Sequence, residues 1–177
     1  MSMKIWVDAD SVPVQYRQII LKRATKENIA TIFVADRTLN DVLIARDNHS
    51  ALLRDPYRQS MEREELRKIK SAIEMVVVTT GANSADDYII DNISEDDLLI
   101  THDIPLASRA VSLNALVLDD RGNTYTEENI KARLSERNMM NELRCLGLFV
   151  EKQGAMGEKT KTEFSNAFDR ALVKLKK

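Results

Sequence analysis

Aspartate residues closely follow three apolar, strand-like segments of this chain. They are Asp8 and Asp10 near the N-terminus, Asp86 and Asp87 in the middle, and Asp103 further along. Carboxylates that gather in one place repel one another and are costly to desolvate, so they need protons or a cation. With one cysteine and two histidines in the chain, the suited ion is hard and prefers oxygen ligands, namely Mg²⁺ or Mn²⁺. Such an ion activates water for in-line attack on a phosphodiester, so these residues predict phosphodiester hydrolysis.

The apolar segments before these aspartates are expected to be neighbouring strands of one parallel sheet. Residues 5–7 form a short run of β-forming side chains, typical of a strand covered on both faces, and residues 75–79 and 98–101 resemble it. In an open α/β sheet the carboxyl ends of parallel strands share one edge, and ligands bind outside that edge. We therefore expect all five aspartates to lie there, as catalytic residues and metal ligands.

Strand-like and helix-like patterns alternate along most of the chain. Further strands are expected at residues 30–35 and 115–118, with amphipathic segments between the strands. This alternation predicts an α/β fold with a Rossmann-like parallel sheet flanked by helices. Residues 38–60 fit both a short helix and a strand, so their structure stays open. Residues 60–72 mix charges of both signs at spacings that support an exposed helix. The simplest interpretation is that these charges only keep one face of the helix in contact with water.

The C-terminal part of the chain shows helical patterns alone. They cover residues 127–140, a short piece at 142–146, and residues 160–176. The last pattern carries Phe164, Phe168 and Leu172 at helical spacing, so this helix is expected to pack back on the domain. A length of 177 residues suits one domain. We expect an α/β domain over residues 1–150 and a C-terminal helix over 151–177, separated by a glycine-containing stretch from Gly154 to Gly157.

Most of the aspartates also have a purely structural interpretation. Asp10, or Ser11 beside it, can cap the helix expected to follow, and Asp103 can cap the next helix along the chain. Asp86 and Asp87 fit the first turn of a helix, where the helix dipole favours negative charge. At these four positions the sequence leaves both the metal-ligand interpretation and the structural one open. The first aspartate of the chain is harder to explain structurally, because it ends an apolar strand before the cap position.

Charge, cysteine content and apolar runs limit the classes of protein to which this chain can belong. The chain has 26 Lys and Arg against 28 Asp and Glu, so no global positive field indicates nucleic-acid binding. Cys145 is the only cysteine, which excludes an internal disulfide and a multi-cysteine zinc site. The N-terminus has no signal-peptide pattern, and no apolar run approaches the roughly 18 residues that span a bilayer. We expect a cytoplasmic protein with no membrane contact, and the sequence makes no prediction of its oligomeric state.

Four motifs make a resemblance to a known family specific. They are VDADSVP at 7–13, GANSADDYII at 81–90, LLITHDIPLAS at 98–108 and DDRGNTYTEENI at 119–130. In this order, and over nearly the whole chain, they resemble the YaiI/YqxD family of uncharacterised bacterial proteins. That family is similar to PIN/FEN-type nucleases, in which a Rossmann-like sheet gathers acidic residues around divalent metal. The resemblance implies a PIN-like fold and a metal-dependent nuclease acting on RNA or DNA.

The resemblance also implies roles for individual residues. Asp8 is the expected carboxylate of the first strand, Asp86 or Asp87 the expected helix acid, and Asp103 the acid of a T-x-D motif that Thr101 positions.

Two positions depart from the family pattern. Ser11 stands where a cysteine is expected, so a thiol is not essential in this chain. Asn83 stands where an aspartate is expected, which leaves Asp86 and Asp87 to carry more of the charge.

Two other functions remain open. The opening D-x-D-x-V also resembles the nucleophile motif of haloacid-dehalogenase-type phosphatases, with Asp119 and Asp120 as imitations of that family's metal-binding acids. A non-catalytic nucleic-acid-binding protein would instead contact phosphates through basic residues in the middle of the chain. We call these residues the basic arm: Arg37, Arg46, Arg54, Arg58, Arg63, Arg67, Lys68 and Lys70. His102 is either a proton carrier or, more simply, a surface histidine.

Overall fold

A single mixed sheet organises the chain, as seen in a computed structural model that describes residues 2–81, 83–148 and 157–176. Its strands are β1 (Ile5–Asp8), β2 (Thr31–Ala35), β3 (Ile73–Val77), β4 (Leu98–Ile100), β5 (Leu116–Leu118) and β6 (Thr124–Tyr125). Their order in the sheet is β3-β2-β1-β4-β5-β6. The first five are parallel, and β6 pairs antiparallel with β5. The predicted α/β fold with a mainly parallel, Rossmann-like sheet is confirmed.

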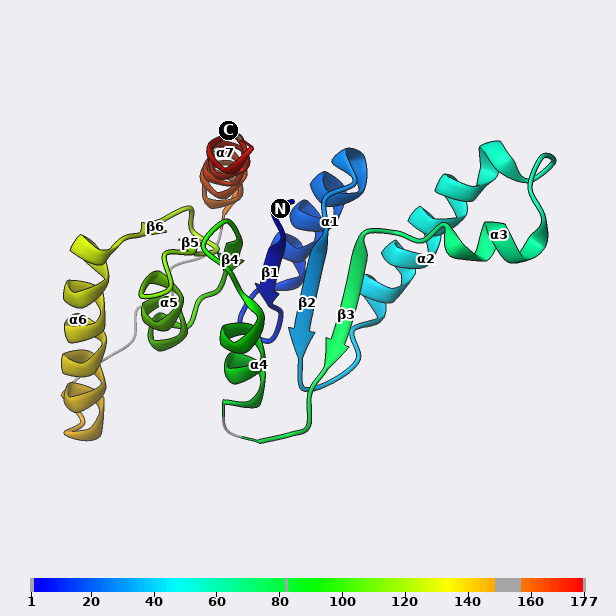
Figure 1. Cartoon of the computed structure of the whole chain (residues 1–177). Helices are drawn as coiled ribbons and strands as arrows, with labels where there is room; N and C mark the ends of the chain where they lie inside the picture. The colour runs from blue at the N-terminus through cyan, green and yellow to red at the C-terminus, as the bar shows by residue number, and fades with distance from the viewer. Residues whose placement is uncertain (1, 82, 149–156, 177) are drawn as a thin grey trace.

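Helices cover both faces of this sheet (Figure 1). They are α1 (Val14–Glu27), α2 (Asn40–Arg54), α3 (Arg63–Lys68), α4 (Ser84–Asn92), α5 (Ile104–Val111), α6 (Glu127–Cys145) and α7 (Glu158–Leu175). Side chains of α1, α2 and α7 belong to one hydrophobic core, and those of α4, α5 and α6 to the other. In Figure 1, α3 lies at the far end of α2, away from the sheet. None of the helices described has the length and apolar content needed to span a bilayer.

Strand side chains alternate between the two cores, as a pleated strand requires. In β1, Ile5 and Val7 enter the core beneath α1 and α7, whereas Trp6 enters the core beneath α4 and α5. The exposed fraction of each of these side chains is 4% or less. Burial on both faces explains why the central strands are uninterrupted apolar runs rather than alternating patterns.

Helix α7 packs on the first of these cores. Phe164, Phe168 and Leu172 are each at most 1% exposed, and the Phe164 ring meets Tyr16 of α1 edge to face with centroids 5.4 Å apart. This contact joins the last helix to the first one, 148 residues earlier. The expected boundary near residue 150 and Gly154 lie outside the described residues.

The middle of the chain differs most from expectation. Residues 40–54 form helix α2, whose Val42 is fully buried against the sheet, and a 3₁₀ turn at Asp55–Tyr57 follows. Tertiary packing of one apolar face therefore decides a segment whose local pattern was ambiguous. The helix expected over residues 60–72 is limited to α3, and the separate piece expected at 142–146 is part of the continuous α6. Strand β6 is too short to leave a recognisable pattern.

Candidate functional site

The carboxyl ends of the central strands open into a small pocket of about 310 Å³, which we call the acidic pocket. Its position is the one at which parallel α/β sheets bind ligands. Residues that follow β1, β2, β3 and β4 contribute to it. Its polar lining consists of Asp8, Asp10, Ser11, Asp36, Asn83, Ser84, Asp86 and Asp103.

Asp8 is the most enclosed of these carboxylates, with 5% of the residue exposed. Burial raises the pKa of Asp8, hydrogen bonds from Thr101 and Ser11 partly offset this effect, and the charges of Asp103 and Asp10 raise it further. The Thr101 hydroxyl donates to Asp8 Oδ2 at 2.8 Å, and its oxygen accepts the Asp103 N–H at 3.0 Å. Thr101 thereby ties the loop after β4 to the end of β1.

Asp86 enters the pocket from the first turn of α4. Burial raises its pKa to about 6, with further contributions from the negative charges of Asp103 and Asp8, while Arg109 opposes the shift. Helix α4 begins after Asn83, which has a positive φ of 64° and makes no side-chain cap. Asp86 therefore combines partial burial with repulsion from carboxylates that follow two other strands.

Other aspartates near the pocket are held by backbone groups. Asp10 Oδ2 accepts the N–H of Asp36 at 2.9 Å, which links the loops after β1 and β2. Asp103 Oδ1 accepts the Leu106 N–H at 3.0 Å, so the structural interpretation of Asp103 as the cap of α5 is confirmed.

The predicted capping of α1 by Asp10 or Ser11 is wrong, because α1 begins after Pro13 without a side-chain cap. The Ser11 hydroxyl instead donates to Asp8 O at 3.1 Å and accepts the His102 N–H at 3.0 Å. Ser11 thus connects the β1 loop to the β4 loop rather than serving the helix.

Asp87 does not line the acidic pocket. It is exposed on α4 and forms an ion pair with Arg109 of α5 at 2.9 Å. A helix turns by roughly 100° per residue, so adjacent aspartates point in different directions. Asp119 and Asp120, which the phosphatase interpretation needs beside Asp8, do not line the pocket either.

Within the described ranges, no three Asp, Glu, His or Cys side chains are placed to hold one metal ion. Four of the five predicted aspartates thus line the acidic pocket, but their side chains do not form the single ligand cluster that the sequence predicted. The hydrogen bonds and ion pair described above direct the carboxylates of Asp10, Asp103 and Asp87 toward other groups. The pocket still has the right ligand type, because its charged groups are all oxygen donors.

Asp36 is a pocket residue that sequence reasoning missed. It directly follows β2, and the same rule that selected Asp8, an aspartate at the carboxyl end of an apolar strand, would have found it. It was not selected because the structure of residues 38–60, which follow it, could not be predicted from the sequence.

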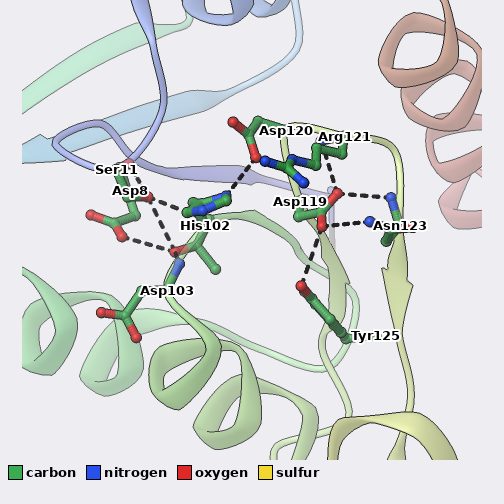
Figure 2. Close-up of polar contacts among 10 residues, drawn as sticks. Asp8, Ser11, His102, Asp103, Asp119, Asp120, Arg121, Asn123 and Tyr125 are labelled. Carbon is green, nitrogen blue, oxygen red and sulfur yellow. Dashed lines mark hydrogen bonds and ion pairs between the residues drawn. The ribbon is translucent and has the colours of Figure 1, made fainter. Parts of the chain in front are cut away.

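A second missed feature lies on the other side of the β4 loop, around the paired Asp119 and Asp120 (Figure 2). Asp120 is 1% exposed and its Oδ1 lies 2.8 Å from His102 Nδ1. This hydrogen bond raises the pKa of His102 above its ordinary value, and burial partly opposes it. The prediction of a merely superficial histidine is incomplete, because this half-exposed ring is oriented by a buried carboxylate.

Asp119 organises the turn between β5 and β6. Its Oδ1 accepts the N–H groups of Arg121 and Asn123, and its Oδ2 accepts the Asn123 side-chain amide and the Tyr125 hydroxyl. Burial and the charge of Asp119 raise the pKa of Tyr125 to about 12. Both oxygens of Asp119 therefore accept hydrogen bonds that stabilise the turn.

Above this turn lies a pocket of about 350 Å³, which we call the arginine pocket. Its floor is the His102 loop and the β5–β6 turn, and its wall is one face of α6. Its basic lining consists of His102, Arg121, Arg133, Arg137 and Arg144. The signal in the sequence was the spacing of the arginines at 133, 137 and 144, which places them on one helical face.

Most of the basic arm lies on and around α2 and α3, which are far from α6 in Figure 1, whereas Arg37 directly follows Asp36 of the acidic pocket. Arg46 pairs with Asp47 at 2.9 Å, and Arg58 pairs with Asp55 at 3.2 Å. Arg54 Nε donates to the Ile69 carbonyl at 2.8 Å. Several of its cations therefore already have partners within the chain.

Comparison with known proteins places the sequence in one group. The model of a family described as "Uncharacterized BCR, YaiI/YqxD family" matches residues 60–174. A UPF0178 protein of Desulfotalea psychrophila is 40% identical over 98% of this chain and 100% of its own length. UPF0178 proteins of Citrifermentans bemidjiense and Treponema denticola are 36% and 37% identical over 98% and 97% of the chain, and 96% and 93% of their own lengths. No solved structure matches the chain at a significant level.

Proposed function

The chain belongs to the uncharacterised YaiI/YqxD family, and from that premise we propose that it is a divalent-metal-dependent nuclease. Its substrate is RNA or DNA, and hydrolysis takes place at the acidic pocket. One observation carries the proposal: Asp8, Asp86 and Asp103, from three separate parts of the chain, line one pocket, where the charge of Asp103 raises the pKa of both Asp8 and Asp86. Carboxylates under such repulsion favour a cation, and pockets with perturbed pKa values are common at functional sites.

Asp8, Asp10, Asp86 and Asp103 would hold Mg²⁺ or Mn²⁺, which are hard ions that prefer carboxylate oxygens, after their side chains turn from the positions described above toward one ion. When bound, the ion supplies an activated water and neutralises charge on the phosphodiester. The protein's own contribution is positioning. Thr101 restrains Asp8 through its hydroxyl and the Asp103 backbone through its oxygen.

Ser11 and Asn83 shape the walls of the site. Ser11 bonds to the backbone at Asp8 and at His102, so it sets the separation of the β1 and β4 loops. Asn83 adopts the positive φ that lets the chain turn into α4 and present Asp86 to the pocket. Neither residue adds charge, so the carboxylates supply all of the negative charge that attracts a cation.

Thermal melting of the wild type and of Asp8→Asn, with and without Mn²⁺ or Mg²⁺, tests this proposal. A ligand that binds only the folded protein raises its melting temperature, by about 2.7 kcal/mol of stability at a hundredfold excess over Kd. We expect a metal-dependent rise in the wild type that is lost in Asp8→Asn. Without metal the variant should be as stable as the wild type or more stable, because it relieves carboxylate repulsion.

Asp96→Asn is the matched control, because Asp96 is an exposed aspartate before β4, at the opposite end of that strand. It should keep the metal-dependent rise. Cleavage of labelled RNA and DNA oligonucleotides under the same metals completes the test. Full cleavage by Asp8→Asn would contradict the proposal, and metal-independent binding without cleavage would favour the non-catalytic nucleic-acid-binding protein.

A further inference from the structure

The arginine pocket and the acidic pocket are neighbours that share one loop. Asp103 lines the acidic pocket, whereas the adjacent His102 lines the arginine pocket. The backbone between them is fixed, because the His102 N–H donates to Ser11 Oγ and the Asp103 N–H donates to Thr101 Oγ1. Figure 2 shows His102 between Asp8 and Asp120. A ligand that extends past this loop would therefore contact carboxylates on one side and guanidinium groups on the other.

The arginine pocket is a built site rather than a chance grouping of surface cations. Asp120, buried to 1% exposure, holds Nδ1 of His102, so the other ring nitrogen is the one left for a ligand. Asp119 fixes the turn that carries Arg121 and anchors the hydroxyl of Tyr125, which is 7% exposed and lies in the floor. Side chains held in this way are preorganised and lose little freedom when a ligand binds.

The charge in this pocket is available to a ligand. Arg121 and Arg137 form no ion pair with a residue of the described ranges, and Arg133 makes only a long 3.7 Å contact with Glu136. The Asp119 carboxylate accepts four hydrogen bonds from its own turn, and no ion pair joins it to an arginine of the described ranges. Guanidinium groups bind phosphate oxygens bidentately and are weakly hydrated, which suits them to phosphate recognition.

We propose that the arginine pocket binds a backbone phosphate of the nucleic-acid strand whose neighbouring phosphodiester enters the acidic pocket. This inference rests on the proposed function, since it assigns the substrate's path through that site. Arg121 and Arg137 are the principal phosphate contacts, and His102 holds the same phosphate from the loop side. The acidic pocket repels a bare polyanion, so the arginine pocket supplies the attraction that brings the strand to the carboxylates.

Fluorescence anisotropy in EDTA, with short labelled RNA and DNA oligonucleotides, tests binding without metal or turnover. Each phosphate contact contributes about 0.9 to the slope of log K against log salt for duplex DNA and about 0.7 for single strands. We expect Arg121→Ala and Arg137→Ala each to weaken binding roughly 5- to 10-fold at 0.1 M salt and to reduce that slope by about 1. Arg170→Ala, an exposed arginine of α7, is the matched control and should bind as the wild type does.

The outcomes separate this inference from the alternatives. Wild-type binding by both pocket variants overturns it, as does a loss confined to Arg67→Ala of the basic arm. Equal binding of oligonucleotides with and without a terminal phosphate supports the backbone phosphate, and tighter binding of the phosphorylated one overturns it in favour of a chain-end phosphate. Melting curves in EDTA verify that each variant is folded. Cleavage plays no part in this assay, so a failure of the nuclease proposal and a failure of phosphate binding are recorded separately.

Discussion

At the level of single residues, the acidic pocket combines charges that the fold does not neutralise. Asp86 shows most clearly that these charges reduce folding stability, because its pKa is raised to about 6 by burial and by the charges of Asp103 and Asp8. A carboxylate that ionises reluctantly in the folded state destabilises the protein at neutral pH. Such a cost is typical of a site that is kept for function rather than for stability.

Asp86→Asn should therefore stabilise the metal-free protein. The folded pKa of about 6 exceeds the value of 3.8 for an unperturbed aspartate, so the wild type loses stability as pH rises between these values. The variant lacks this loss. Its gain should be near zero at pH 4 and about 1 to 2 kcal/mol at pH 7, since water screens the partly exposed side chain.

Urea denaturation in EDTA at both pH values measures this gain, with Asp96→Asn as the control for removing an exposed carboxylate. A gain that does not change with pH would contradict the assigned cause. The same variant should lose part of the metal-dependent rise in melting temperature, because Asp86 is one of the proposed ligands.

At the level of elements, the turn between β5 and β6 is fitted closely against α7. Gly122 has a φ of +88°, and a Cβ atom there would lie 2.8 Å from the Glu163 carbonyl oxygen of α7. The same turn carries Arg121 into the arginine pocket and is held by Asp119. Packing of the last helix thus helps to set the shape of a pocket built mainly from α6 and the β4 loop.

Gly122→Ala should destabilise the protein by roughly 2 to 4 kcal/mol, because it combines a left-handed backbone with a clash against backbone atoms. Gly147→Ala provides the matched comparison. Gly147 also has a positive φ, of +70°, but a Cβ atom there would meet nothing within 4 Å, so only about 1 kcal/mol is expected. Urea denaturation of both variants measures the difference, and equal losses would show that the Glu163 contact is unimportant.

At the level of the whole molecule, the two cores and the sheet between them form one connected structure. Phe168 of α7 is 1% exposed and stacks on Phe164 with ring centroids 5.8 Å apart. Trp6, the only tryptophan, lies on the opposite face of the sheet beneath α4 and α5. Its fluorescence therefore reports on a region that α7 does not touch directly.

Phe168→Ala should lower the stability by roughly 3 to 5 kcal/mol, because it opens a cavity in the core. If α7 and the sheet unfold as one cooperative unit, Trp6 fluorescence and far-UV circular dichroism should shift to the same lower midpoint. Val173→Ala, on the same helix but 58% exposed, should change the midpoint little. Separate transitions in Phe168→Ala would instead make the C-terminal helix an independent unit.

The fold class, the central strands and the aspartates that follow them could be predicted from the amino-acid sequence. These features depend on local patterns: apolar runs for buried strands, and polar residues where each strand ends. The YaiI/YqxD motifs were equally readable, and comparison with known proteins confirmed the family.

Tertiary structure alone decided which loops meet. The strand order places β2 beside β1, so Asp36 joins Asp8 at the acidic pocket, whereas helix rotation leaves Asp87 outside it. The pairing of His102 with Asp120 and the arginine face of α6 depend on contacts between segments 18 or more residues apart. Side-chain direction and long-range pairing are properties of the packed molecule, and no local pattern specifies them.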